Sequence, residues 1–126
     1  MKPKVSISID VADMEIASLF YSNALGCEME RNGEETSVLS TENTTIYLLK
    51  KLPGSNPLLA GNTSRDFNRH WTPVHLDFVV ETIDETVALV LKYGGTCEGG
   101  ESGDWGKIAY CADPFGNGFC LVVINE

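Results

Sequence analysis

The chain has 126 residues, of which 43% are apolar and 21% are charged, and its formal net charge is −9. This length suits one compact domain with its own core, and the composition excludes disordered and collagen-like classes. An acidic surface repels phosphate backbones, which argues against a nucleic-acid partner. No apolar run approaches the ~20 residues of a membrane span, and the N-terminus lacks the apolar segment of a secretory signal. We therefore expect a cytoplasmic protein with no membrane partner.

The first elements of the chain occur twice. Residues 5–26 and 74–95 share one pattern at an offset of 69 residues (74 minus 5). Each copy begins with alternating apolar and polar residues, which predicts a strand. Each then continues as an amphipathic stretch that ends at glycine, which predicts a helix. An internal repeat of this kind indicates two related structural modules.

In the first copy, Asp13 is the expected N-cap of the helix. Its predicted buried stripe consists of Ile16, Leu19, Phe20 and Ala24. Three short strands are expected behind it, near residues 27–31, 36–41 and 45–50. Module one therefore spans about residues 4–50 and has the order strand, helix and three strands.

Residues 51–72 form a long connection that contains two prolines and two glycines. Loops of this length are usually functional or mobile. A lid over a site and a plain linker are both open interpretations.

The second copy starts at about residue 73 and runs to residue 126. The segment "TIDE", from Thr82 to Glu85, predicts a capping box, and Val87, Val90 and Leu91 are the expected buried positions of the helix. Strands are expected near residues 96–99, 107–112 and 118–124. The glycine-rich residues 94–106 are interpreted as a flexible hairpin connection, and "DPFGNG" predicts a tight turn before the last strand.

The four cysteines are Cys27, Cys97, Cys111 and Cys120. Their spacing does not match a structural zinc site. We expect them to be reduced thiols, most of them buried.

The doubled strand–helix–three-strand module, "VHLDFVV" at residues 74–80 and "ADPFGNGFCLV" at residues 112–122 resemble the vicinal oxygen chelate superfamily. This superfamily includes glyoxalase I, extradiol dioxygenases and bleomycin-resistance proteins. The resemblance implies an α+β fold in which two tandem βαβββ modules form an open cupped mixed sheet with the helices outside. It also implies a ligand in the cup and a homodimer.

Metal-dependent members of the superfamily take ligands from the first and last strand of each module. The corresponding positions here are Ser6, Tyr47, His75 and Cys120. Only His75 is a usual ligand of this family, so we expect no cofactor, with a divalent metal at His75 as the alternative. Asp77 lies on the same strand face, although residues i and i+2 of a strand are about 6–7 Å apart and seldom share one ion.

Each candidate residue also has a structural interpretation. His75 either contacts the ligand or is a satisfied histidine bonded to Asp77, and a His–Asp pair also suits acid–base chemistry. Cys120 is more typical of a buried, inert thiol. Tyr110 and Tyr47 suit either the cup wall or an ordinary amphipathic strand. Trp105, and less clearly Trp71, suit the rim of a pocket that stacks on a flat ligand.

The sequence thus predicts a single domain that binds a small organic molecule in the cup, in the manner of bleomycin-resistance proteins. The predicted ligand-binding residues are Ser6, Tyr47, His75, Asp77, Trp105, Tyr110 and Cys120. The alternative is a metal-dependent lyase, isomerase or dioxygenase with a rearranged site around His75. The sequence leaves open whether the protein is an enzyme.

Overall fold

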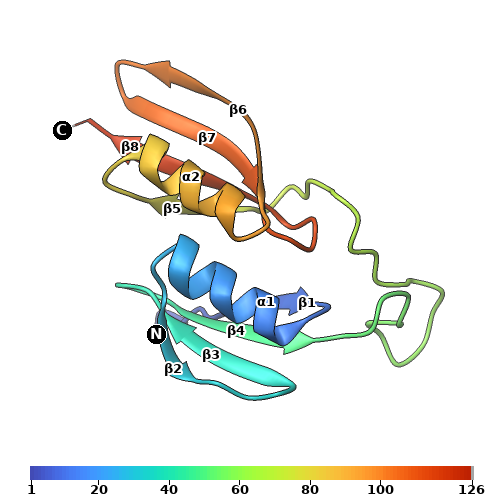
Figure 1. The fold of residues 1–126 in the computed structure, drawn as a ribbon. Helices are drawn as coiled ribbons and strands as arrows, with labels where there is room; N and C mark the ends of the chain where they lie inside the picture. Colours follow the sequence, from blue (N-terminus) through green and yellow to red (C-terminus); the bar gives the residue numbers. More distant parts are fainter. Residues whose placement is uncertain (126) are drawn as a thin grey trace.

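The computed structural model describes residues 1–125 and consists of two βαβββ modules (Figure 1). Module one contains β1 (Ile7–Val11), α1 (Met14–Leu19), the π-helical turn η1 (Phe20–Ala24), β2 (Glu28–Arg31), β3 (Thr36–Ser40) and β4 (Thr45–Lys50). Module two contains β5 (Leu76–Val79), α2 (Ile83–Lys92), β6 (Thr96–Gly103), β7 (Gly106–Ala112) and β8 (Gly118–Ile124). The predicted α+β class and the tandem repeat are confirmed.

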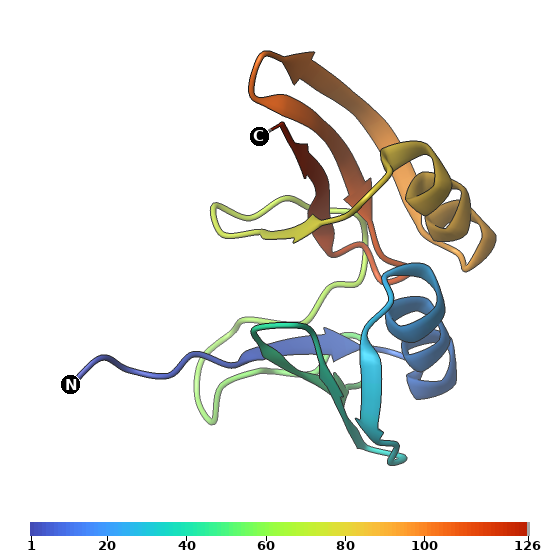
Figure 2. The same ribbon diagram turned by 90° about the vertical axis from the view of Figure 1, so that its left-hand side faces the viewer.

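Each module builds its own four-stranded mixed sheet. The strand orders are β1-β4-β3-β2 and β5-β8-β7-β6, so the two sheets have the same topology. In each sheet the first strand pairs in parallel with the last, and the remaining neighbours are antiparallel. Figure 2 shows both helices on one side of the molecule and the strands of both modules on the other. The expected cup is therefore made of two sheets, and backbone pairing does not join them within residues 1–125.

The N-terminus of the first helix is capped as predicted, but that of the second is not. The Asp13 carboxylate accepts a hydrogen bond from the amide of Ile16 at 2.9 Å. Thr82 occupies the N-cap position of α2, yet its hydroxyl donates to the Glu85 carboxylate at 3.2 Å instead of accepting from an amide. The capping-box prediction is therefore wrong. Both helices are followed by a glycine with positive φ, Gly26 at 76° and Gly94 at 96°, as the sequence predicts.

The buried stripe of the first helix is shifted by one residue from its predicted position. Phe20 and Ala24 are buried as expected, together with Ala17 and Tyr21, whereas Ile16 and Leu19 are each 46% exposed. Two sets of apolar residues with helical spacing overlap in this sequence. Contacts with module two determine which set is buried. The Phe20 ring packs edge-on against Phe119 with centroids 6.0 Å apart.

The second helix follows its prediction at two of three positions. Val90 is fully buried and Val87 is partly buried against the core. The sequence predicts that Leu91 is buried, but it is 54% exposed, because only one side of the helix meets the sheet. No helix within residues 1–125 is long and apolar enough to cross a membrane.

The modules share one hydrophobic core. Residues of α1 and η1 belong to the same buried cluster as Val90 of α2 and Leu121 of β8. A buried hydrogen bond crosses between the modules, in which the hydroxyl of Tyr21 donates to Asp113 at 2.6 Å. Asp113 begins the "DPFGNG" turn, and its carboxylate also accepts from the amides of Phe115 and Asn117. The predicted turn is confirmed and ties the end of module two to the first helix.

The glycine-rich segment is more ordered than expected. β6 continues to Gly103 and pairs with β7, so most of residues 94–106 is strand and not a flexible connection. A Cβ atom on Gly100 would lie 2.4 Å from the carbonyl oxygen of Ile108. Glycine is therefore required at this position for the close approach of β6 and β7. The glycine content of this segment reflects strand packing and not flexibility.

Candidate ligand site

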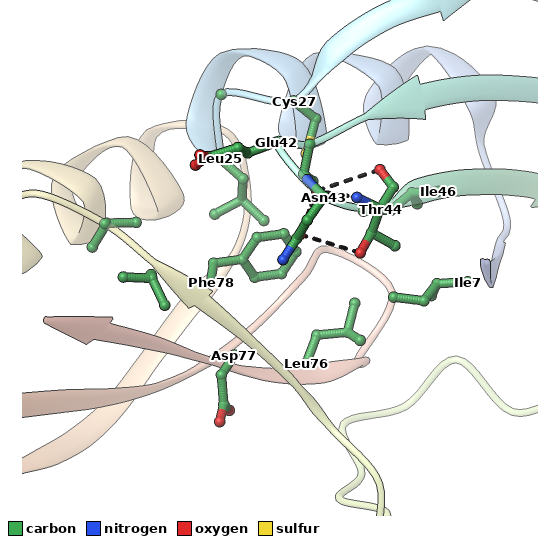
Figure 3. A pocket seen from close by; sticks show the side chains of 14 residues that line it. Ile7, Leu25, Cys27, Glu42, Asn43, Thr44, Ile46, Leu76, Asp77 and Phe78 are labelled. Carbon is green, nitrogen blue, oxygen red and sulfur yellow. Dashed lines mark hydrogen bonds between the residues drawn. The ribbon is translucent and has the colours of Figure 1, made fainter. Parts of the chain in front are cut away.

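The strand β5 and the residue before it place a histidine and an aspartate on the face opposite the core. Leu76 and Phe78 pack against the hydrophobic core. Because side chains alternate along a strand, His75 and Asp77 point to the other face. Figure 3 shows Asp77 directed away from Leu76 and Phe78. His75 and Asp77 remain partly open to solvent, with 38% and 50% of their side chains exposed.

Three polar side chains meet on this face of the second sheet. β5 and β8 are paired so that Asp77 lies beside Cys120. His75 Nδ1 is 2.9 Å from Asp77 Oδ1 and 3.8 Å from Cys120 Sγ. Burial and, to a lesser extent, the Asp77 carboxylate raise the pKa of the Cys120 thiol to about 11. Cys120 is therefore a neutral thiol near pH 7, and not an activated nucleophile.

The contact with Asp77 sets the state of the histidine ring. An ionised carboxylate only accepts hydrogen bonds, so His75 Nδ1 carries the proton. In the neutral ring Nε2 is then an acceptor, free to receive a hydrogen bond or to bind a cation. Asp77 thus orients His75. The histidine is bonded to Asp77 and also offers Nε2 to a ligand, so both interpretations from the sequence apply together.

Aromatic rings form one wall of the site. Trp71 lies edge-on to His75 with ring centroids 5.9 Å apart, and edge-on to Tyr110 at 6.2 Å. Trp71 also packs against the backbone of β8 at Gly118, where a Cβ atom would lie 2.8 Å from the indole. The Trp71 ring therefore contacts both His75 and Tyr110 and packs against β8.

The same wall carries two further carboxylates. Glu98 of β6 binds the guanidinium of Arg69 through both of its oxygens, with Arg69 Nη2 2.7 Å from Oε1, and it accepts from the Trp71 indole at 3.3 Å. The hydrogen bond from Arg69 lowers the pKa of Glu98. Glu101 accepts from the Tyr110 hydroxyl at 2.7 Å, and this hydrogen bond raises the pKa of Tyr110. The guanidinium carbon of Arg69 lies 4.4 Å from the centroid of Trp71.

Two cavities meet at His75. The first has a volume of about 390 Å³ and is lined by Trp71, His75, Glu98, Tyr110 and Cys120. The second, of about 350 Å³, extends from His75 along β1 and is lined in part by Ser8, Asp10, His70 and Thr72. We call the first of these the aromatic cavity.

A third cavity, of about 340 Å³, lies where the two modules meet (Figure 3). It is lined by Ile7 and Ile46 of module one and by Leu76 and Phe78 of module two. The polar residues 41–44 of the loop between β3 and β4 contribute to its lining. The chemistry-bearing groups gather on the opposite face of β5.

The structure brings together four of the seven predicted ligand-binding residues: His75, Asp77, Tyr110 and Cys120. The other three are elsewhere. Ser6 is exposed and precedes β1, Tyr47 is half-buried in the sheet of module one, and Trp105 is 49% exposed in the hairpin between β6 and β7. Neither Ser6, Tyr47 nor Trp105 is among the five residues that line the aromatic cavity.

The sequence left a role of the connecting loop and of Trp71 open, but it did not predict the contributions of Arg69, His70 and Thr72 or of β6. Arg69, His70, Trp71 and Thr72 all lie at the site, and Arg65 of the same loop binds Asp10 of β1 at 2.9 Å. This loop is thus fastened to both modules. The cluster "NRHW" just before "TPVH" was the available signal, because cationic and aromatic residues stand together there. Glu98 had no such signal, since its segment was interpreted as a flexible connection.

The cluster of His75, Asp77 and Cys120 has the chemistry of a metal site held by module two alone. The three potential ligand atoms lie within 4.8 Å of one another. Ligands of a zinc-like ion lie at about 2.0–2.3 Å from it, which matches the spacing between His75 and Cys120. An ion bound at His75 Nδ1 would have to displace the proton that this atom donates to Asp77, and also the proton of the Cys120 thiol. The imidazole, carboxylate and thiol groups of this cluster are therefore suitable ligands for a borderline metal ion.

Comparison with known proteins identifies the family. A sequence model described as a glyoxalase-like domain matches residues 6–122. The chain belongs to the glyoxalase-like domain family. This finding confirms the resemblance to the vicinal oxygen chelate superfamily. A comparison with curated protein sequences finds no significant match.

Solved structures share the glyoxalase-like fold at low sequence identity. The hypothetical protein SA1046 from S. aureus is 22% identical, with a TM-score of 0.71 over 98% of both chains. A glyoxalase/bleomycin resistance protein from Albidiferax ferrireducens T118 is 20% identical, with a TM-score of 0.69 over 95% of this chain and 97% of that one. The fosfomycin resistance protein FosX from Listeria monocytogenes, complexed with Mn(II) and sulfate, is 15% identical, with a TM-score of 0.75 over 99% and 92%. These likenesses show the fold and leave the activity to be inferred from the site.

Proposed function

We propose that this glyoxalase-like protein binds a small, flat organic cation in the aromatic cavity. The observation that carries the proposal is the combination of an aromatic wall with an excess of carboxylates. Trp71, Tyr110 and His75 supply ring surfaces, and Asp77, Glu98 and Glu101 supply negative charge. One of these carboxylates, Glu98, binds the guanidinium of Arg69.

The position of Arg69 supports a preference for cations. Its guanidinium lies over Trp71 and is bound by both oxygens of Glu98. Cations placed over an indole ring gain about 0.5–2 kcal/mol from the ring electrons, more when desolvated. A ligand that carries an amidine or guanidine on a flat ring would find the same two partners if Arg69 moved aside. The expected neutral state of Cys120 is consistent with binding rather than nucleophilic catalysis.

A thermal-shift and calorimetric screen tests this proposal. The panel consists of aromatic amidines and guanidines, their neutral amide isosteres and aromatic carboxylates of the same size. We expect binding of the cations only, weakened at least several-fold in Trp71→Ala and Glu98→Gln. Trp105→Ala is the matched control, because Trp105 is an exposed tryptophan in the hairpin and should leave binding unchanged. Equal binding of the neutral isosteres would contradict the proposed role of charge.

A second candidate function is metal-dependent chemistry of the lyase, isomerase or dioxygenase type. The clustering of His75, Asp77 and Cys120 favours it. The test is elemental analysis of protein purified without chelator or nickel resin, after addition of zinc, manganese, iron, nickel or cobalt separately. Near-unit stoichiometry that is lost in His75→Ala and Cys120→Ala, but kept in Cys97→Ser, would establish the ion. Absence of stoichiometric metal under every condition would contradict this second function, and binding of an organic cation would remain as the proposed function.

A further inference from the structure

Two cysteines lie directly opposite each other in the second sheet. Cys97 of β6 is paired with Cys111 of the antiparallel strand β7. Directly opposed residues of antiparallel strands have Cα atoms about 4.5–5.5 Å apart, within the range that a disulfide bond spans. Their side chains also point to the same face of the sheet. Cys111 belongs to the hydrophobic core on the side of α2, so Cys97 lies on that side too.

The two thiols differ in access. Cys97 is exposed and lines a groove of about 420 Å³ between α2 and the β6–β7 hairpin, together with Ile83 and Val87. Cys111 is fully buried. Burial raises the pKa of Cys111 to about 12, and the neighbouring Cys97 thiol contributes to the rise. A water-borne oxidant therefore reaches Cys97 first.

The backbone next to Cys97 can adjust to a covalent link. The pairing of β6 and β7 shifts register between Cys97 and Gly100. Gly99, within that shift, has a φ of 122°, a value that side-chain-bearing residues rarely adopt. All eight residues of β6 are exposed, so a small rotation of the strand displaces no core packing. Cys97 and Cys111 lie beside this glycine bulge, so their Cβ atoms can move to the short separation that a disulfide bond requires.

We propose that Cys97 and Cys111 form an oxidation site that closes to an intramolecular disulfide when a hydroperoxide is present. The Cys97 thiolate attacks the peroxide, which forms an S–O bond and breaks the O–O bond. The products are a sulfenic acid and hydroxide, or an alkoxide that water protonates when the peroxide is organic. The Cys111 sulfur then attacks the Cys97 sulfur. The S–S bond forms, the S–O bond breaks and water leaves with the Cys111 proton. Cys97 is the oxidised thiol and Cys111 the resolving thiol.

The bond would close beside the candidate ligand site. Glu98, which binds Arg69 and Trp71, follows Cys97, and Tyr110 precedes Cys111. The disulfide would fix β6, which carries Glu98, to β7, which carries Tyr110. An effect on ligand binding would rest on the proposed function, whereas formation of the bond does not depend on it.

Mass spectrometry of the intact protein after treatment with hydrogen peroxide tests the proposal. We expect a loss of two hydrogens from a monomer, reversed by dithiothreitol, and a non-reduced peptide map that links Cys97 to Cys111. Cys97→Ser and Cys111→Ala should both abolish the link. Cys27→Ala is the matched control, since it removes another buried thiol and should keep the link.

The course of oxidation in Cys111→Ala separates the two steps. Without the resolving thiol, Cys97 should accumulate as sulfenic acid that reacts with dimedone, or proceed to sulfinic acid. Cys111 is buried, so Cys111→Ala is compared with Cys97→Ser. Cys97 is exposed, and its substitution should leave the fold intact. A wild-type protein that forms only Cys97–Cys97 dimers, or sulfinic acid at Cys97 with no internal link, would overturn the proposal.

Discussion

The Nδ1 atom of His75 lies 2.9 Å from the Oδ1 atom of Asp77. A bond between these two residues is one of the interpretations that the sequence left open, although residues i and i+2 of a strand seldom share one metal ion. His75 precedes the first residue of β5, and its ring nitrogen reaches the Asp77 carboxylate. The pair presents Nε2 of His75 as an acceptor next to the aromatic cavity, as the acid–base and binding interpretations both require.

Asp77→Asn should increase the reactivity of Cys120. Burial and the Asp77 carboxylate raise the pKa of this thiol, so removal of the negative charge lowers the pKa and increases the thiolate fraction. We expect iodoacetamide to label Cys120 about two- to fivefold faster at pH 8.5, because a fraction of a pKa unit changes the thiolate fraction by that factor. Labelling is followed by peptide mass spectrometry.

Cys27 is the internal control for this experiment. It is a buried thiol whose pKa is raised to about 11 by burial, without a contribution from Asp77. Its labelling rate should be the same in both proteins. Equal acceleration of Cys27 and Cys120 would show that the substitution loosened the fold and did not act through charge.

The contact between Glu98 and Trp71 should persist into acid solution. Arg69 lowers the pKa of Glu98 below its ordinary 4.5. A carboxyl with a lowered pKa in the folded state contributes stability above its unfolded pKa and loses it as pH falls through the folded value. In a Trp105→Phe background, Trp71 fluorescence should therefore stay constant from pH 7 to 4.5 and change below that. Glu98→Gln should remove the transition, and a transition centred above pH 4.5 would contradict the Arg69 contact.

Tyr21→Phe should destabilise the protein by about 1–3 kcal/mol, because it removes a buried donor from the Asp113 carboxylate. Urea unfolding measures the free energy. Burial and the Asp113 charge raise the pKa of Tyr21, so its contribution is complete below pH 10 and declines as the pH rises toward the folded value. The variant and the wild type should therefore differ less at strongly alkaline pH.

Tyr110→Phe is the matched control for this variant. It removes a hydroxyl that donates to Glu101 at the surface, and surface substitutions usually change stability by less than about 0.5 kcal/mol. A similar loss in Tyr21→Phe and Tyr110→Phe would show that the buried inter-module hydrogen bond has no special role.

The protein should form a homodimer in solution. Strand β6 is exposed along its whole length at the edge of its sheet, and several large apolar side chains are exposed nearby or on the same module, among them Val79, Leu91 and Ile124. Exposed strand edges and apolar surface favour association. Size-exclusion chromatography with light scattering should give twice the mass of 13.7 kDa. A constant monomer mass up to high protein concentration would contradict this prediction.

The sequence by itself determined the repeat, the order of elements and the face of β5 that carries His75 and Asp77. These follow from local rules, because strand alternation, the Asp13 cap and the glycines after each helix act over a few residues. The tertiary structure decided which helical stripe is buried, since Phe20 packs against Phe119 and Tyr21 bonds to Asp113, and both partners lie more than ninety residues away in the sequence. It also decided that Arg69, Trp71 and Glu98 complete the site, because strand register and loop closure bring together residues that no local pattern connects.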